Sequence, residues 1–350
     1  MSATASCHFP YLNEWKQYCD KNKILAFIDS VLSGYAQLAF NDNTFSGILM
    51  IIATWIGSPT LCINALWGTI VATATAYLIG ISKDSIRSGS YGFNAALACL
   101  SVPVLLFPSQ EVSFAMLAIS AAIAVFTVIV KIALGKYLSR WNLPTLVIPY
   151  CIALLISLEI LTITGIANNT SVTIDTLLFT TPISNWSMKE LALTFLNCAS
   201  QIIWLSTPIS GILYLIALLF ASRLDTINTI IAIIVCMFVS VLLGLPKNAV
   251  ISGLYGYNAI LLTQVMTRGF LLNKKSYVLT FFLAGLTVVM CCFYQLILPY
   301  LGIGSFLALP YLTLVLLTFA NRKRLKTLTY VPSEHWGVPE TISDSFTKKL

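Results

Sequence analysis

Charged side chains are scarce in this 350-residue chain, where Asp, Glu, Lys and Arg together make up 9% of the residues and hydrophobic residues make up 58%. A soluble domain carries about 25% charged residues. Only 19 charges, 8 acidic and 11 basic, lie between Ile24 and Ala320, which is too few to cover a globule of that size in water. The scarcity excludes a cytosolic enzyme, an extracellular binding domain and a disordered protein. It predicts an all-α polytopic membrane protein built from helices about 20 residues long.

Histidine is nearly absent, and both copies, His8 and His335, lie near the ends of the chain. The nine cysteines show no C-x-x-C spacing, since Cys291 and Cys292 are adjacent, and no pair of carboxylates lies inside an apolar run. Enzymes need acid–base, nucleophilic or metal-binding groups of these kinds. We therefore expect no catalytic residue, no metal site and no cofactor, and a membrane-embedded enzyme is a remote alternative.

The sequence lacks the motifs that two classes of channel and one class of partner require. An ammonium channel lined by paired histidines does not fit two terminal histidines, and no TVGYG-like loop offers a potassium filter. The net charge of +7 does not indicate nucleic-acid binding, because no basic helix is interleaved with aromatic residues. Met1–Lys23 is polar and has no apolar core, so no cleavable signal peptide is expected.

Ten apolar runs follow one another along the chain, and several are well short of 20 residues. Short, glycine-interrupted segments at matching places in two halves are typical of the broken helices of a transport site. An amphipathic stretch precedes each half, at Ile24–Phe40 and Leu191–Leu205. The apolar runs are Phe45–Trp55, Leu61–Ile81, Gly92–Phe107, Ser113–Gly135, Thr145–Ile166, Gly211–Ser222, Thr226–Leu245, Gly256–Val265, Tyr277–Leu298 and Ser305–Ala320.

The chain contains an internal repeat whose matching residues are separated by 164 positions. Gln37 pairs with Gln201 and Phe40 with Trp204, and a weaker third pair of segments has a spacing of 161. Two motifs in the same order at one offset indicate a duplication. The paired segments are SGYAQLAFNDNTFSG (Ser33–Gly47) with ASQIIWLSTPISG (Ala199–Gly211), SGSYGFNAAL (Ser88–Leu97) with SGLYGYNAIL (Ser252–Leu261), and LPTLVIPY (Leu143–Tyr150) with GSFLALPY (Gly304–Tyr311).

The positions of the basic residues indicate that the two halves have opposite orientations. Five spans in each half would make the second half an inverted repeat of the first. With the N-terminus inside, the external loops hold only Lys189 and Lys247, as the positive-inside rule requires. We therefore expect a plasma or inner cell membrane and two cytoplasmic termini. The predicted boundaries are 1–23 for the N-terminal tail, 24–166 for the first transmembrane repeat, 167–190 for the external linker, 191–321 for the second repeat and 322–350 for the C-terminal tail.

Two glutamines mark the predicted transport site. Gln37 and Gln201 lie on equivalent short helices, which should end near Phe40 and near Trp204 because turn residues follow. A helix that stops inside a membrane leaves its last carbonyls without partners, and such backbone is tolerated where it lines a wet cavity. Carbonyls together with a Gln amide form a column of acceptors that suits a neutral solute rich in N–H donors and does not suit an anion. Hydrogen bonding between helices is the alternative role for these glutamines.

Aromatic residues accompany these acceptors at equivalent places, Phe40 with Trp204 and Phe93 with Tyr257. Facing aromatic rings would form a flat slot for a flat molecule, and packing or contact with lipid is the alternative. Asn94 and Asn258 each follow a Tyr-Gly-aromatic turn and are expected to cap the helix that starts there.

The doubled S-G-x-Y-G-[FY]-N-x-x-L motif, the doubled glutamine segment and the LPTLVIPY block resemble the urea transporter family over about Ile24–Ala320. The resemblance implies two inverted-topology repeats of five transmembrane helices plus a pore half-helix each, with a central pore at the pseudo-two-fold interface. It also implies a homotrimer in the lipid bilayer and passive, channel-like transport of urea or a close small amide. A channel of the same fold for another small neutral solute, such as a short-chain amide, ammonia or water, is the alternative.

The matching motifs also imply which side chains line that pore. The glutamines would belong to ladders of oxygens for urea N–H groups, and the other residues would line the flat slot. The residues concerned are Gln37, Leu38, Phe40, Phe93, Leu97, Gln201, Ile202, Trp204, Tyr257 and Leu261.

Val147 and Ala308 stand where many members of that family have a threonine two residues before the proline of the LP-x-x-T-x-P block. Those hydroxyls face the middle of the pore in the family, so the resemblance places both residues in its lining. Each lost hydroxyl removes about 0.5–1.5 kcal/mol of net hydrogen bonding. A more apolar middle raises the barrier for urea, or indicates a different or broader solute.

Three charges inside the repeats require a role. Glu159 and Lys131 lie in apolar runs but toward their ends, where long side chains reach the membrane surface, so structural or subunit-interface roles are favoured. Glu159 would permit proton coupling if it faced the pore. Asp42 follows the first half-helix and is expected to accept hydrogen bonds from backbone amides of its turn.

Overall fold

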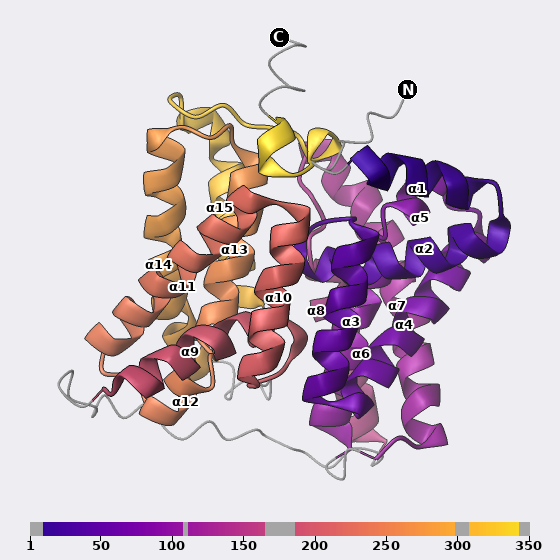
Figure 1. Ribbon diagram of the computed structural model, residues 1–350, viewed down its shortest axis with the longest axis horizontal. Helices are drawn as coiled ribbons and strands as arrows, with labels where there is room; N and C mark the ends of the chain where they lie inside the picture. Colours follow the sequence, from indigo (N-terminus) through magenta and orange to yellow (C-terminus); the bar gives the residue numbers. More distant parts are fainter. Residues whose placement is uncertain (1–9, 108–110, 165–185, 298–307, 343–350) are drawn as a thin grey trace. The chain divides into compact units, whose positions relative to one another are not determined.

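A computed structural model describes residues 10–107, 111–164, 186–297 and 308–342 (Figure 1). Within these ranges the chain forms α-helices joined by turns and short 3-10 segments, and the pairing of Phe270 with Tyr330 is an isolated β-bridge. The all-α prediction is therefore confirmed for the described part of the chain. Most of the predicted external linker, 167–190, lies outside the described residues.

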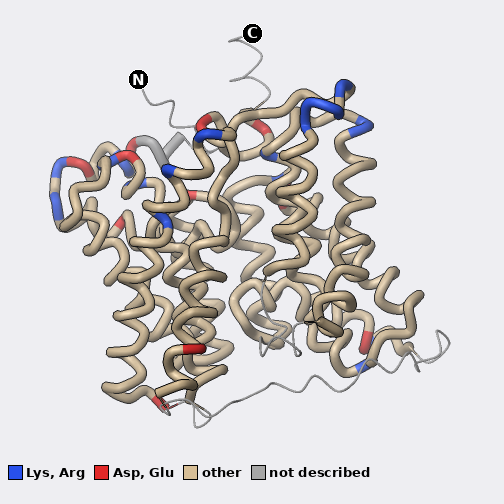
Figure 2. The backbone as a smooth tube through the Cα atoms, turned by 180° about the vertical axis from the view of Figure 1, so that it is seen from behind, with Lys and Arg blue, Asp and Glu red and all other residues tan. Residues whose placement is uncertain are grey.

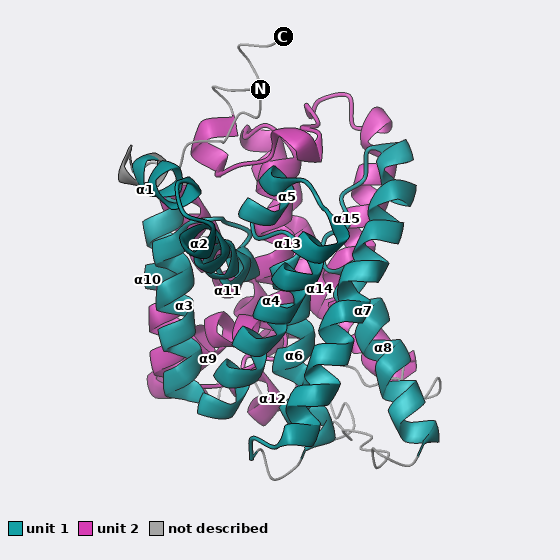
Figure 3. Ribbon diagram, turned by 90° about the vertical axis from the view of Figure 1, so that its right-hand side faces the viewer, with its two compact units in different colours: residues 1–170, 216–222 teal, residues 171–215, 223–350 magenta. Residues whose placement is uncertain are grey.

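The helices group into two compact units (Figure 3), Met1–Thr170 with Ile216–Ser222 as unit 1 and Ser171–Leu215 with Arg223–Leu350 as unit 2. Helix α10 (Pro208–Ala221) contributes residues to both. The other elements of unit 1 are α1 (Pro10–Asp20), α2 (Lys23–Ala36), η1 (Gln37–Ala39), α3 (Thr44–Gly57), α4 (Pro59–Ile79), α5 (Lys83–Arg87), α6 (Gly92–Leu106), α7 (Phe114–Leu138), η2 (Ser139–Trp141) and α8 (Ile148–Ile163). Those of unit 2 are α9 (Met188–Ser200), η4 (Gln201–Ile203), α11 (Arg223–Leu242), α12 (Lys247–Ile251), α13 (Gly256–Gly269), α14 (Lys274–Ile297), α15 (Leu309–Ala320), η6 (Arg322–Arg324) and η7 (Ser333–His335).

Four helices of the described residues are long and apolar enough to cross a membrane, namely α4, α7 with η2, α11 and α14. Two further candidates are bent: α2–η1 meets α3 at 73°, and α9–η4 meets α10 at 70°. Helices α6, α8 and α15 are apolar but shorter. Nine of the ten apolar runs lie mainly on these helices, whereas Gly256–Val265 lies on α13, which also buries the polar residues Gln264 and Arg268.

Side-chain caps mark where α3 and α4 of unit 1 begin. The Asn43 side chain accepts hydrogen bonds from the backbone N–H groups of Phe45 and Ser46 at the start of α3. Ser58 does the same for Leu61 at the start of α4, where proline occupies the first turn. These caps satisfy N–H groups that have no partner inside their own helix. Helix α3 therefore begins at a defined residue after the bend that follows α2–η1.

A glycine in each repeat lets two consecutive helices touch at the bend. A Cβ atom on Gly47 in α3 would lie 2.2 Å from the carbonyl oxygen of Leu32 in α2. A Cβ atom on Gly211 in α10 would lie 2.0 Å from the carbonyl oxygen of Leu196 in α9. Real Cβ atoms do not approach backbone this closely, so glycine is required at both places. The Ser-Gly pairs that end the repeated segment therefore have the same packing role in each half.

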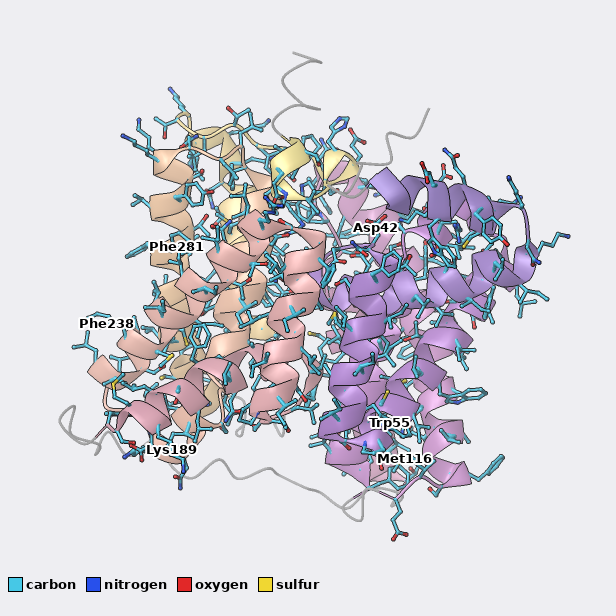
Figure 4. All side chains as sticks on the ribbon, in the orientation of Figure 1. Asp42, Trp55, Met116, Lys189, Phe238 and Phe281 are labelled. Carbon is cyan, nitrogen blue, oxygen red and sulfur yellow. The ribbon has the colours of Figure 1, made fainter. Side chains whose placement is uncertain are left out.

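Charges lie mostly near one end of each unit (Figure 2). In unit 2 the C-terminal residues 321–342 lie at one end, and α12 with the start of α9 lies at the other (Figure 1). Lys189 lies at that second end (Figure 4), where Lys247 forms a 2.7 Å ion pair with Glu190. In unit 1, Asp42 and Trp55 lie toward opposite ends (Figure 4).

The C-terminal segment after α15 packs against unit 2. Leu271 donates its backbone N–H to the carbonyl of Thr329 at 3.0 Å, and Val331 donates to Gly269 at 2.9 Å. The Tyr330 ring lies 5.3 Å from the Phe319 ring, centroid to centroid. Burial raises the pKa of the Tyr330 phenol, partly offset by the nearby Arg322 guanidinium. This part of the predicted C-terminal tail is thus folded onto the helices.

Candidate functional site

Two sets of residues carry the predicted site, one in each half of the chain. The first-half set is Gln37, Leu38, Phe40, Phe93, Leu97 and Val147. The second-half set is Gln201, Ile202, Trp204, Tyr257, Leu261 and Ala308.

Both half-helices end where the sequence predicts. Helix α2 tightens into η1, and the next residue, Phe40, adopts a left-handed backbone with φ of 51°. Helix α9 tightens into η4 in the same way, and Trp204 has φ of 60°. A left-handed backbone is uncommon for residues other than glycine. Its recurrence at two large aromatic residues 164 positions apart shows that the two repeats use one terminating structure.

Each glutamine is tied to the turn before the next repeated helix. The Gln37 amide nitrogen donates to the carbonyl oxygen of Ser88 at 2.9 Å. The Gln201 amide nitrogen donates to the carbonyl oxygen of Ser252 at 2.8 Å and to the Ser206 hydroxyl at 2.8 Å. A carbonyl can only accept, so these bonds orient the two amides and leave each amide oxygen as the acceptor that the glutamine presents. Both glutamines are only half-buried.

The two aromatic residues of the first-half set are neighbours. The ring centroids of Phe40 and Phe93 are 6.4 Å apart, and the ring planes are inclined by 57°. The rings therefore meet at an angle rather than as parallel walls. In unit 2, Trp204 and Tyr257 are both half-buried. The smaller members of both sets are buried, with exposed fractions of 2% for Leu38, 9% for Leu97, 1% for Val147, 3% for Ile202, 7% for Leu261 and 4% for Ala308.

Asn94 and Asn258 do not cap their own helices, so the capping prediction is wrong in its detail. The Asn94 amide donates to the carbonyl of Leu146 at 3.2 Å, and its oxygen accepts from the backbone N–H of Tyr150 at 3.1 Å. The Asn258 oxygen accepts from the N–H of Tyr311 at 3.3 Å. Each asparagine therefore satisfies the first turn of a different helix, α8 or α15.

These bonds fix the last members of the two sets. Val147 is the residue before α8, next to the Leu146 carbonyl that binds Asn94. Ala308 is the residue before α15, whose first turn binds Asn258. Asn94 and Asn258 belong to helices that also carry Leu97 and Leu261. One buried asparagine in each half thus connects the helix that carries Leu97 or Leu261 to the start of α8 or α15.

Lys131 is a residue near the first-half set whose position the sequence reasoning missed. Its ammonium donates to the Ser90 carbonyl and lies 4.8 Å from the centroid of the Tyr91 ring and 5.1 Å from that of the Phe93 ring. The side chain turns toward α6 instead of reaching along the helix to the membrane surface. The sequence contains one indication of a buried polar contact here. Position 295, the repeat equivalent of position 131, also holds a polar residue, Gln295.

Glu159 and Asp42, the two acidic residues noted in the sequence, have different surroundings. Glu159 is exposed on α8. Asp42 forms an ion pair with Lys16 of α1, a partner that the turn prediction did not include. Helix α1 is also tied down by Trp15, whose indole nitrogen donates to Asp29 at 2.8 Å, and Asp29 in turn pairs with Arg87 at 2.9 Å. Among the residues that the structure describes, no group of three His, Cys, Asp or Glu could hold a metal ion.

Comparison with known proteins gives the family. The model of the urea transporter family matches residues 28–323. Urea transporter 1 of Ovis aries is 28% identical over 246 residues, which cover 69% of this chain and 63% of the relative. Urea transporter 1 of Mus musculus is 29% identical over 250 residues, with the same two coverages. The match thus spans about 63% of the length of these relatives. Because the family model matches well over half of the chain and the helices are apolar, this protein is a multi-pass membrane protein of the urea transporter family, a family of transporters rather than enzymes.

Proposed function

We propose that this protein passes urea, or a close small amide, down its concentration gradient through a narrow pore. The observation that carries the proposal is the repeated anchoring of a glutamine at the end of a broken helix, Gln37 on Ser88 and Gln201 on Ser252. Family membership and the names of the relatives support urea as the solute. A small neutral solute of another kind, such as a short-chain amide, ammonia or water, is the second candidate, because Val147 and Ala308 carry no hydroxyl.

We propose that the two halves are inverted repeats, 24–166 and 191–321, joined by an external linker at 167–190, with the pore at their pseudo-two-fold interface. In that arrangement the tails 1–23 and 322–350 are cytoplasmic. The basic cluster Arg322–Lys326 in the proposed cytoplasmic tail, against only Lys189 and Lys247 in the proposed external loops, supports this orientation under the positive-inside rule. The protein would lie as a homotrimer in the lipid bilayer of a plasma or inner membrane.

Passage requires that the solute leave most of its water. The amide oxygens of Gln37 and Gln201, together with the last carbonyls of their half-helices, would accept the N–H groups of urea in place of water. The aromatic residues of both sets would contact its faces. An ion would lose far more hydration energy than a neutral amide and would meet no fixed counter-charge in either set. The arrangement therefore favours a neutral, flat molecule with several N–H donors.

The apolar middle, at Val147 and Ala308, affects which solute passes best. A solute at this point has no side-chain hydroxyl to replace lost water, which costs about 0.5–1.5 kcal/mol for each missing bond. Urea, with more polar groups than formamide, has more to lose. We therefore propose that, with urea as the solute, this protein transports it more slowly than family members with threonines at these places.

Flux into proteoliposomes tests the proposal. Purified protein in liposomes is mixed with urea, formamide, ammonia or an impermeant osmolyte, and the change in volume is followed by stopped-flow light scattering. Urea or formamide entry well above that of empty liposomes supports amide transport. Acceleration of ammonia or water alone would replace the proposal with the second candidate.

A further inference from the structure

We propose that Lys131 is a specificity-determining residue that keeps planar cations out of the pathway while neutral amides pass. The inference rests on the proposed function, because it assigns one residue a role in the selectivity of the same site. The glutamines and the aromatic residues of the two sets carry no charge, whereas Lys131 does. The shape of urea is shared by guanidinium, a flat cation of nearly the same size, so shape alone does not separate the two.

Lys131 belongs to α7, and its charged end is turned toward the first-half set. The ammonium donates to the carbonyl of Ser90 and faces the rings of Tyr91 and Phe93, at 4.8 and 5.1 Å from their centroids. Within the described part of the chain, no carboxylate lies within 4 Å of the Lys131 ammonium. Aromatic faces stabilise a cation without cancelling its charge.

The charge lies next to residues of the proposed pathway. Phe93 contacts both the ammonium and the ring of Phe40, which lies 6.4 Å away from it. The same turn that binds Lys131 through Ser90 binds Gln37 through Ser88. A solute against Phe40 and Phe93 would therefore feel a net positive field from Lys131.

The second half has a neutral residue at the equivalent position. Position 295, which lies 164 residues after Lys131, is Gln295. Its amide oxygen lies 3.4 Å from the hydroxyl of Tyr255, the repeat partner of Tyr91. A neutral amide thus holds the corresponding tyrosine in unit 2. The two halves therefore differ by one positive charge at this position, and its consequence for a nearby solute is electrostatic.

Coulomb's law gives the size of that consequence. For an effective dielectric constant of about 20 and a separation of about 8 Å, a single positive charge lowers the occupancy of a cation about 30-fold relative to a neutral molecule. Urea, which has no net charge, is affected little. Removing the charge should therefore change the ratio of guanidinium to urea flux and leave urea flux nearly constant.

The test compares Lys131→Gln, Lys131→Met and Lys131→Arg in the full chain, reconstituted in proteoliposomes. Urea flux is measured by stopped-flow light scattering, and guanidinium flux is measured as uptake of labelled guanidinium driven by a membrane potential. We expect Lys131→Gln and Lys131→Met to keep urea flux within about twofold and to raise guanidinium flux at least tenfold. Lys131→Arg, which keeps the charge, should behave as the unmodified protein.

Gln295→Met is the matched control, because it removes a polar group from the repeat-equivalent position without changing charge. We expect guanidinium flux in this variant to stay at the level of the unmodified protein. Unchanged guanidinium flux in Lys131→Gln, with urea flux retained, would overturn the proposal and leave Lys131 as a structural tie. A rise in guanidinium flux in Gln295→Met equal to that in Lys131→Met would overturn it as well. Absence of urea flux in the unmodified protein would instead contradict the proposed function.

Discussion

Gln37 is joined to Ser88 by a 2.9 Å hydrogen bond from its amide nitrogen to the serine carbonyl, which links the end of a half-helix to the turn before α6. The bond recurs 164 residues later between Gln201 and Ser252 at 2.8 Å. The two halves therefore share a backbone shape at Phe40 and Trp204 together with the side-chain bond that orients the nearest amide.

Removing either glutamine amide should slow transport. We expect Gln37→Leu and Gln201→Leu each to lower urea flux about tenfold, because leucine removes an acceptor and leaves a serine carbonyl without its donor, a loss of about 1–3 kcal/mol. Flux is measured in proteoliposomes and normalised to incorporated protein. Gln17→Leu, the same change at an exposed position of α1, should keep full flux. Unchanged flux in both pore variants would mean that these amides serve packing alone.

Restoring the missing hydroxyls should speed urea transport. We expect Val147→Thr combined with Ala308→Thr to raise urea flux several-fold, since each new hydroxyl can supply about 0.5–1.5 kcal/mol of hydrogen bonding to a solute. The comparison needs equal amounts of reconstituted protein and a formamide series alongside urea. Val278→Thr, on an exposed position of α14, provides the control. A double variant with the flux of the unmodified protein would show that these positions do not limit transport.

The two asparagines should matter for stability. Asn94→Ala leaves the Tyr150 N–H and the Leu146 carbonyl without their side-chain partner, and Asn258→Ala does so for Tyr311. We expect each change to lower the free energy of unfolding by about 1–3 kcal/mol. Thermal unfolding in detergent, followed by tryptophan fluorescence, measures the effect. Asn321→Ala, at an exposed site, is the control, and equal stability of all three variants would contradict the assigned role.

Asp225 and Arg268 form a buried pair in unit 2, with N–O distances of 3.0 and 2.5 Å. We expect Asp225→Asn or Arg268→Met alone to destabilise the protein by about 3–5 kcal/mol, because each leaves a buried charge without its partner. The double variant should lose less than the sum of the two single losses, as a thermal double-mutant cycle would show. Glu334→Gln, in the exposed pair with His335, should change stability by at most about 1 kcal/mol. Strict additivity would refute the coupling.

The repeat and the local backbone could be predicted from the sequence because they depend on neighbouring residues. The turn residues after Phe40 and Trp204 indicated where the half-helices stop, and the paired segments indicated that the same structure would recur in both halves. The continuous apolar runs indicated the helices, since a helix that crosses a membrane needs a long apolar segment.

Contacts between distant segments could not be predicted in the same way. Asn94 was expected to cap α6 because it lies in its first turn, but its partners are Leu146 and Tyr150, more than 50 residues away. Lys131 was expected to reach the membrane surface, yet the turn at Ser90 offers a carbonyl and two aromatic faces. The partner that each of these two side chains binds depends on which groups the tertiary fold brings within reach. The pattern of residues along a helix carries no information on that.

Urea flux into liposomes that contain the purified protein is the measurement closest to the central claim. The initial rate is compared with that of empty liposomes and of liposomes that contain the Gln37→Leu, Gln201→Leu double variant. A passive channel predicts urea entry well above empty liposomes, equal rates for equal gradients in either direction, no requirement for an ion gradient, and loss of most of the flux in the double variant. Urea entry no faster than through empty liposomes would contradict the account.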